Sequence, residues 1–181
     1  AGAIEPLVAL LRSGSAEVQE EAAAALGYLA SDNADNQAAI TRAGAIEPLV
    51  ALVRGGSAKA QEEAAAALSN LAYGNADIQE AIAHAGAIEP LVALLRGGIA
   101  AAQQAAAALC FLAASADNRV AIARAGAIEP LVALVRSGSA KAQEAAADAL
   151  GMLADGNADN QEAIARAGAI EPFVALLRSG S

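Results

Sequence analysis

The side chains that could act as a general base or a nucleophile are few in this chain of 181 residues. It contains one histidine, His84, and one cysteine, Cys110. His84 lies at the position that Arg42 and Arg124 occupy in equivalent segments, where a helix is expected to end. We therefore favour a polar residue that interacts with the helix dipole as the role of His84, over a catalytic base. Cys110 lies between the apolar runs AAL and FLA, and no second histidine exists to activate it. These features indicate an inert thiol.

Carboxylates are numerous, but their spacing does not resemble a metal site. Asp148 and Asp155 are seven residues apart, about 10 Å along a helix, without ligand-rich neighbours. A single cysteine excludes a disulfide framework within the chain and a cysteine-rich zinc site. The RSGS and RGGS segments lack the lysine and spacing of a phosphate-binding loop. We therefore expect no catalytic site, no metal and no cofactor.

The remaining carboxylates belong to a repeated phrase, AGAIEP. It begins at Ala1, Ala43, Ala85, Ala125 and Ala167, so the spacings are 42, 42, 40 and 42 residues. A fixed period of this length is typical of stacked supersecondary units. The sequence predicts one solenoid with repeats 1–42, 43–84, 85–124 and 125–166 and a partial repeat 167–181. The Glu-Pro pairs within the phrase recur with it, which indicates a structural role at the start of a helix.

Each repeat carries the signals of three helices of different length. In the first repeat, Pro6 suits the first turn of a helix that Gly14 ends. Ser15 is a suitable N-cap for a long helix over roughly 16–30. Asn33 ends this helix and caps a short third one. Apolar residues recur at helical spacing in each segment, so the elements that position any functional side chain are helices.

Composition restricts the class of partner. Hydrophobic residues make up 56% of the chain and aromatic residues 2%, which is typical of closely packed helices with small contact residues. No apolar run is long enough to span a membrane, and the N-terminal segment does not resemble a signal peptide. The net charge of −9 argues against binding to nucleic acid and is compatible with a basic or amphipathic partner. We expect a soluble protein, intracellular (cytoplasmic or nuclear) if it is natural.

The motifs resemble those of the armadillo repeat. They are the GAIxPLVxLL phrase, the SAxxQE segment that opens the long helix, ALSNLA at 67–72 and NxDNQxAI at 33–40. The resemblance extends over the whole chain and implies an all-α fold, a right-handed α-solenoid superhelix with three helices in each unit of about 42 residues. HEAT repeats, which have two helices and a similar period, are the alternative.

Most differences between the repeats lie on one stripe of the long helix. Its four positions, spaced i, i+3, i+4 and i+7, hold Ala24, Ala66, Ala107 and Asp148; Gly27, Ser69, Cys110 and Gly151; Tyr28, Asn70, Phe111 and Met152; and Ser31, Tyr73, Ala114 and Asp155. Five of the six tyrosine, phenylalanine, cysteine and methionine residues occupy this stripe. The third repeat also differs in length: one residue is lost near 98–102 and a second at the loop position of Asn33.

The resemblance implies that this stripe faces a concave groove. In armadillo proteins a Trp and an Asn four residues apart often bind an extended peptide there. None of the Trp positions holds Trp here, and only Asn70 matches the Asn, which argues against capture of nuclear-localisation peptides in the manner of importins. The predicted partner-binding residues are Ala24, Tyr28, Ala66, Asn70, Tyr73, Ala107, Phe111, Asp148, Met152 and Asp155. Large side chains among them would act as apolar anchors.

Two functions remain open from the sequence. The first is a non-catalytic interaction scaffold whose concave groove binds a peptide or a protein segment. The second is a designed or structural repeat module with no native ligand, in which the stripe varies by drift. Such a module would form end-to-end homo-oligomers through its uncapped ends, because terminal repeats normally carry a polar outer face. Recent duplication and consensus design are both compatible with repeats this similar.

Overall fold

The computed structural model describes residues 2–97 and 99–179, and these residues form thirteen α-helices and no strand. The long helices are α2 (Ala16–Ala30), α5 (Ala58–Ala72), α8 (Ile99–Leu112) and α11 (Ala140–Ala154). We call the helices that begin within the AGAIEP phrase the intermediate helices. They are α1 (Ile4–Ser13), α4 (Ile46–Gly55), α7 (Ile88–Leu94), α10 (Ile128–Ser137) and α13 (Ile170–Ser179), and each has 10 residues except α7, which has 7. The short helices are α3 (Ala34–Arg42), α6 (Ala76–His84), α9 (Ala116–Arg124) and α12 (Ala158–Arg166).

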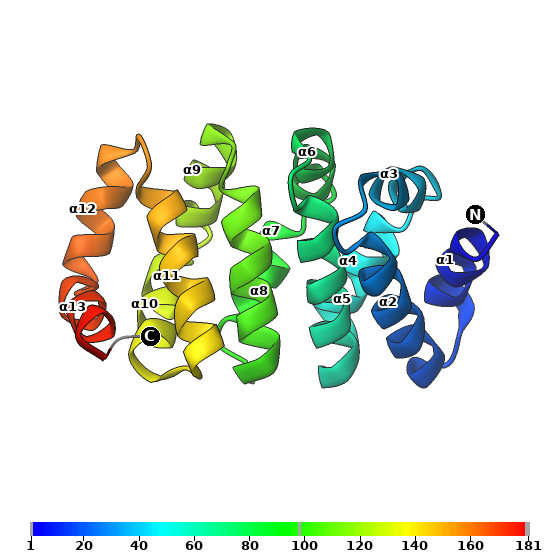
Figure 1. Cartoon of the computed structure of the whole chain (residues 1–181), viewed down its shortest axis with the longest axis horizontal. Helices are drawn as coiled ribbons and strands as arrows, with labels where there is room; N and C mark the ends of the chain where they lie inside the picture. Colours follow the sequence, from blue (N-terminus) through cyan, green and yellow to red (C-terminus); the bar gives the residue numbers. More distant parts are fainter. Residues whose placement is uncertain (1, 98, 180–181) are drawn as a thin grey trace.

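The helices are stacked in layers along one axis. The four long helices lie side by side in the front layer, the helices α4, α7 and α10 lie behind them, and α3, α6, α9 and α12 follow one edge (Figure 1). Each long helix makes its most extensive contacts with the long helices of the neighbouring repeats. The fold is therefore the all-α solenoid that the period predicts. We call the outer surface of α2, α5, α8 and α11 the long-helix face.

The predicted caps are present at the helix starts. The side chain of Ser15 accepts a hydrogen bond from the backbone N–H of Val18, 3.4 Å away, at the start of α2. The side chain of Asn33 accepts one from the N–H of Asn36, 3.0 Å away, at the start of α3. These bonds satisfy backbone donors that a helix leaves unpaired at its N-terminus.

The glycines at the corners act in two different ways. Gly14 ends α1 with an extended conformation (φ −72°), not a left-handed one. A Cβ atom on Gly14 would lie 2.7 Å from the carbonyl oxygen of Leu10 and from Cγ1 of Val18, so glycine is required by close approach. Gly44, in the repeated AGAIEP phrase, has φ +76°, a region that L-residues with a side chain rarely adopt.

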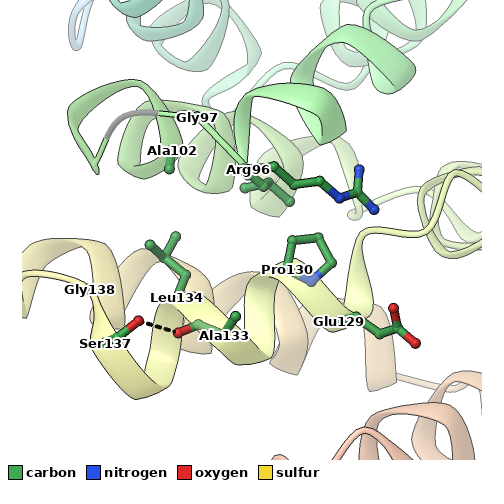
Figure 2. Close-up of a pocket in the computed structure, with 10 residues that line it drawn as sticks. Arg96, Gly97, Ala102, Glu129, Pro130, Ala133, Leu134, Ser137 and Gly138 are labelled. Atoms are coloured by element: carbon green, nitrogen blue, oxygen red, sulfur yellow. Dashed lines mark hydrogen bonds between the residues drawn. The ribbon is translucent and has the colours of Figure 1, made fainter.

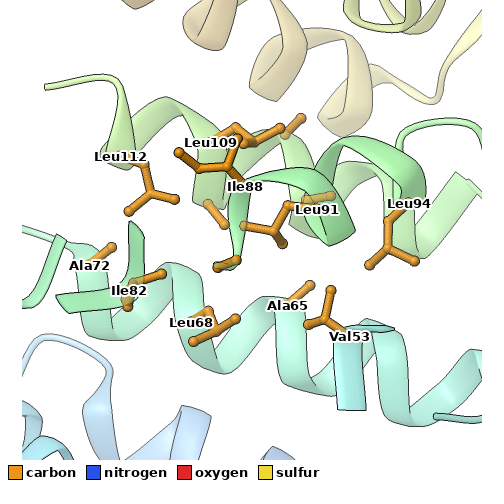
Figure 3. Packing of buried hydrophobic residues seen from close by; sticks show 14 of the residues in the cluster. Val53, Ala65, Leu68, Ala72, Ile82, Ile88, Leu91, Leu94, Leu109 and Leu112 are labelled. Atoms are coloured by element: carbon orange, nitrogen blue, oxygen red, sulfur yellow. The ribbon is translucent and has the colours of Figure 1, made fainter. Parts of the chain in front are cut away.

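One continuous apolar core runs between the layers. Leu68 from α5, Leu91 from α7 and Leu109 from α8 are fully buried, or nearly so, and point toward one another, with Ile82 of α6 nearby (Figure 3). Burying a leucine or isoleucine side chain contributes about 1.5–3 kcal/mol. Because each repeat covers the apolar side of the next, the stack holds the long helices in fixed register.

The third repeat differs from its neighbours at both predicted deletions. Helix α7 ends at Leu94 and is 7 residues long, whereas α1, α4 and α10 have 10. In the first repeat, Nε2 of Gln19 donates a 2.9 Å hydrogen bond to the carbonyl oxygen of Leu11, which links α2 to the C-terminal end of α1. The equivalent residue of the third repeat is Ala102, which cannot form this bond. At the second deletion Ser115 takes the N-cap place of Asn33, and no residue of the loop 113–115 has a positive φ.

Candidate functional site

The ten predicted partner-binding residues all lie on long helices or at their C-terminal ends, and none of them is fully buried. Tyr28, Tyr73, Asp148 and Asp155 are exposed, and Ala24, Ala66, Asn70, Ala107, Phe111 and Met152 are half-buried. Tyr28 is 79% exposed and Tyr73 is 53% exposed, which is unusual for aromatic side chains. Exposed aromatic residues of this kind are frequent at interaction sites.

The aromatic residues of the second and third repeats contact each other. The ring centroids of Tyr73 and Phe111 lie 5.3 Å apart with an interplanar angle of 75°, an edge-to-face arrangement. Such pairs are favourable beyond the area they bury. Since Tyr73 follows α5 and Phe111 lies on α8, the pair joins two repeats into one apolar patch on the long-helix face.

Asn70, which matches the ligand-binding Asn of armadillo proteins, is hydrogen-bonded within the protein. Its Nδ2 donates a hydrogen bond to the carbonyl oxygen of Gly27 on the previous long helix, at 3.0 Å. The side chain of Gln37 reaches the same region and donates to the carbonyl oxygen of Asn70 at 2.9 Å. These bonds connect the first and second repeats, so part of the hydrogen-bonding capacity of Asn70 is used within the protein.

Asp155, at the fourth position of the stripe, lies beside a cationic side chain. The guanidinium of Arg119 lies 4.0 Å from a carboxylate oxygen of Asp155, and its Nη1 donates to the carbonyl oxygens of Ala113 and Ala114 at 3.0 and 3.2 Å. The Arg119 side chain is only 14% exposed, whereas Asp155 is 75% exposed. Asp155 therefore keeps its carboxylate at the surface with a largely covered cation behind it.

Charge is distributed unevenly over the long-helix face. Helix α8 contains no charged residue, whereas α2, α5 and α11 each contain two or more acidic ones. Glu63 forms an ion pair with Lys59 on α5, which raises the pKa of Lys59 chiefly through their hydrogen bond. The face thus has a neutral, partly aromatic centre between acidic helices.

The thiol of Cys110 lies within the neutral centre. Burial in apolar surroundings, reinforced by the negative charge of Asp148, raises its pKa to about 11. A thiol with this pKa is almost wholly protonated near neutral pH, and the thiolate is the nucleophilic form. The structure therefore agrees with an inert cysteine.

Clefts in the structure lie mainly on another surface. Four of them lie between successive intermediate helices. One of these four, with a volume of about 420 Å³, lies between Arg96 and the segment Glu129–Pro130 (Figure 2). Arginines at these clefts link adjacent repeats: Nη2 of Arg12 donates to the oxygen of Gly44 at 2.9 Å, and Nη2 of Arg136 to the oxygen of Gly168 at 2.9 Å. These bonds join residues 32 positions apart, so no local sequence pattern indicates them.

Groups with catalytic or metal-binding potential are sparse in the part of the chain that the structure describes. His84 is exposed in the last turn of α6, with Nε2 4.0 Å from a carboxylate oxygen of Glu80. No cluster of three or more potential metal-binding side chains occurs among the described residues. Over the same residues, no helix combines the length and apolar character that crossing a bilayer requires.

More than half of the chain matches the model of a known repeat family. Residues 1–31, 33–73 and 115–155, more than half of the chain, match the Armadillo/beta-catenin-like repeat. The third repeat, with its two lost residues, falls mainly outside these matches. Each full match runs from a short helix through an intermediate one to a long one, as in α3, α4 and α5. No match was found among curated proteins.

Solved structures of engineered proteins are similar over nearly the whole chain. One engineered protein has a TM-score of 0.90 and 38% identity, covering 98% of this chain and 74% of its own. A designed armadillo repeat protein in complex with the peptide (KR)4 has a TM-score of 0.87 and 33% identity, with coverage of 97% and 74%. A computationally designed armadillo repeat protein for modular peptide recognition has a TM-score of 0.88 and 34% identity, again covering 97% and 74%.

Proposed function

Because the chain belongs to the armadillo repeat family, we propose that it is a non-catalytic scaffold whose long-helix face binds a peptide or protein segment. The observation that carries the proposal is the Tyr73–Phe111 pair, an exposed apolar patch on the neutral centre of this face. Rigid aromatic side chains lose little conformational entropy on binding and often supply most of the binding energy at interfaces. The designed relative with bound (KR)4 supports a peptide as the ligand class.

The charge pattern favours a particular kind of segment. An apolar stretch fits over Tyr73 and Phe111, and basic residues on either side of it fit the acidic helices α2 and α11. Asp148 and Asp155 are exposed at the α11 end and would pair with one basic flank. Complementary charge contributes more to orientation and association rate than to affinity, so the apolar centre would supply most of the binding energy.

A binding assay with matched peptides tests the proposal. The probe is a labelled peptide pool with an apolar centre and basic flanks, and fluorescence anisotropy measures its affinity at low and high salt. Phe111→Ala and Asp148→Lys should each weaken binding at least several-fold, and the Asp148 variant should also reduce the salt dependence. The matched control is Asp159→Lys, which makes the same charge change in the first turn of α12, outside the long helices.

A module without a ligand gives a different result in the same assay. If no peptide of the pool binds, or if the Phe111, Asp148 and Asp159 variants bind as tightly as the original chain, the long-helix face is not a recognition surface. The variation on the stripe would then reflect drift at exposed positions. Circular dichroism of each variant checks that the fold is retained, so that loss of binding is not mistaken for loss of structure.

A further inference from the structure

Helix α13 exposes apolar side chains that its equivalents bury. Ile170, Val174 and Leu177 are 63%, 39% and 84% exposed. The same positions in α1 hold Ile4, Val8 and Leu11, which are 5%, 2% and 2% exposed. These side chains belong to the apolar core, and α1 makes its most extensive contacts with α2, the long helix of the same repeat. Among the described residues, no long helix follows α13 to cover this side of it.

The opposite end of the stack exposes the complementary surface. Val18 on α2 is 37% exposed, whereas its equivalents Ala60 and Ala142 are 2% and 0% exposed. Burying Val18 against another copy is favourable because it removes apolar area from water.

The two ends carry nearly the same helix. Residues 167–181 repeat residues 1–15, except that Phe173 stands in place of Leu7. A long helix such as α2 has one position for this segment, and α1 occupies it within its own chain. Helix α13 of another copy could fill that position with almost the same side chains.

We infer that two copies associate end to end by exchange: α13 of one copy replaces α1 against α2 of the next, and α1 swings out. Exchange of an equivalent element between copies is a low-cost route to association, because the packing that is broken within one copy forms again with the other. Here it also adds a new interface between α11 of the first copy and α2 of the second. The inference does not depend on any ligand of the long-helix face.

The end of the first copy is shaped for the incoming helix. A cleft of about 310 Å³ lies between α11 and α13, lined by residues that include Ala147, Glu144 and Leu177. Glu144 corresponds to Glu20, whose carboxylate accepts a hydrogen bond of 2.5 Å from the hydroxyl of Ser57, the N-cap of the following long helix. Ser15 of the second copy is the N-cap of α2 and offers the same hydroxyl to Glu144.

Rigid stacking of two copies would be less complete. It would place α1 of the second copy against α13 of the first, so that two helices of the same kind become neighbours. Ile170, Val174 and Leu177 would then still lack the long helix that their equivalents contact. Exchange gives these three residues that long helix, and the order of intermediate and long helices continues from one copy into the next. The released α1 is exposed in their place, so the net gain comes from the added interface between α11 and α2.

Sedimentation velocity over a concentration series tests the inference with three variants. A Cβ atom on Gly151 would meet no other atom within 4 Å, whereas the equivalent Gly27 packs against α5, so Gly151→Arg should leave the monomer folded and abolish association. Val174→Asp should also abolish it. Val8→Asp, the same change at the equivalent position of α1, should release α1 and shift association to lower concentration. Because each copy carries a net charge of −9, added salt should strengthen association.

Hydrogen exchange distinguishes the two modes of association. In the exchanged assembly, amides of residues 4–13 lose protection as concentration rises, while those of 170–179 gain it. Rigid stacking would protect both segments and would leave the association of the Gly151→Arg variant unchanged. Either of those results overturns the inference, as does a chain that stays monomeric throughout the series.

Discussion

The spacing of the long helices depends on a glycine that can be compared with an equivalent one in the same chain. Gly27 on α2 is buried against α5, and a Cβ atom there would lie 3.3 Å from Cα of Ala67 and 3.5 Å from its Cβ. Gly151 is the equivalent residue on α11, and a Cβ atom there would meet nothing within 4 Å. The same substitution to alanine therefore tests helix propensity at one site and helix spacing at the other.

The expected free energies follow from these contacts. Alanine is about 1 kcal/mol more favourable than glycine inside a helix, so Gly151→Ala should raise the free energy of unfolding by about that amount. Gly27→Ala gains the same term but forces α2 and α5 apart, and overpacking of this kind costs about 1–3 kcal/mol. The equivalent positions on α5 and α8 accommodate Ser69 and Cys110, which favours the lower end of that range. Gly27→Ala should therefore leave the stability nearly unchanged.

Guanidinium unfolding followed by circular dichroism measures the difference. The two variants should differ by about 1 kcal/mol, or roughly 2–4 °C in Tm for a chain of this size. Measurement at low protein concentration keeps association of the chain ends from contributing. If Gly27→Ala stabilises the protein as much as Gly151→Ala does, then close approach of α2 and α5 is not the reason for glycine at position 27.

Three further predictions concern single residues. Asp32 has φ +51° where the equivalent Gly74 has φ +68°, so Asp32→Gly should raise the unfolding free energy by about 0.5–1 kcal/mol, and Gly74→Ala should lower it by a similar amount in thermal melts. The raised pKa of Cys110, about 11, means that thiolate forms only as the pH rises well above 9. Its alkylation by iodoacetamide at pH 8 should be roughly 100-fold slower than that of the unfolded chain, and equal rates would exclude the raised pKa. Asn70→Ala should cost about 1 kcal/mol by removing the hydrogen bond to the oxygen of Gly27, and an unchanged unfolding midpoint would show that this bond contributes nothing.

Local signals explain how much of the fold could be predicted. The period predicts the number of repeats. The N-cap residues Ser15 and Asn33 predict that helices start directly after them, and α2 and α3 do start at Ala16 and Ala34. These features depend on residues within a few positions of one another, which is why sequence alone was sufficient. The role of Gly14 was predicted only in part, because its extended conformation and its contact with Val18 depend on the angle between α1 and α2.

Contacts between repeats could not be predicted in the same way. The bond from Arg12 to Gly44 joins residues 32 positions apart, and the bond from Asn70 to Gly27 joins residues 43 apart. Their formation depends on how closely neighbouring helices pack, and no short sequence pattern reports that distance. The site prediction therefore identified the exposed aromatic residues, but it did not foresee that Asn70 is already engaged within the protein.

The variable stripe contains two kinds of position with different physical consequences. At the position of Gly27 and Ser69 the side chain is buried between long helices, so its size sets the distance between repeats. At the positions of Tyr28 and Tyr73 the side chain is exposed, so its chemistry sets what the surface can contact. A change of the first kind shifts every exposed side chain of one repeat relative to the next. Recognition by the long-helix face would therefore depend on buried small residues as well as on the aromatic residues that a partner touches, because binding energy depends on contacts aligned to within a fraction of an ångström.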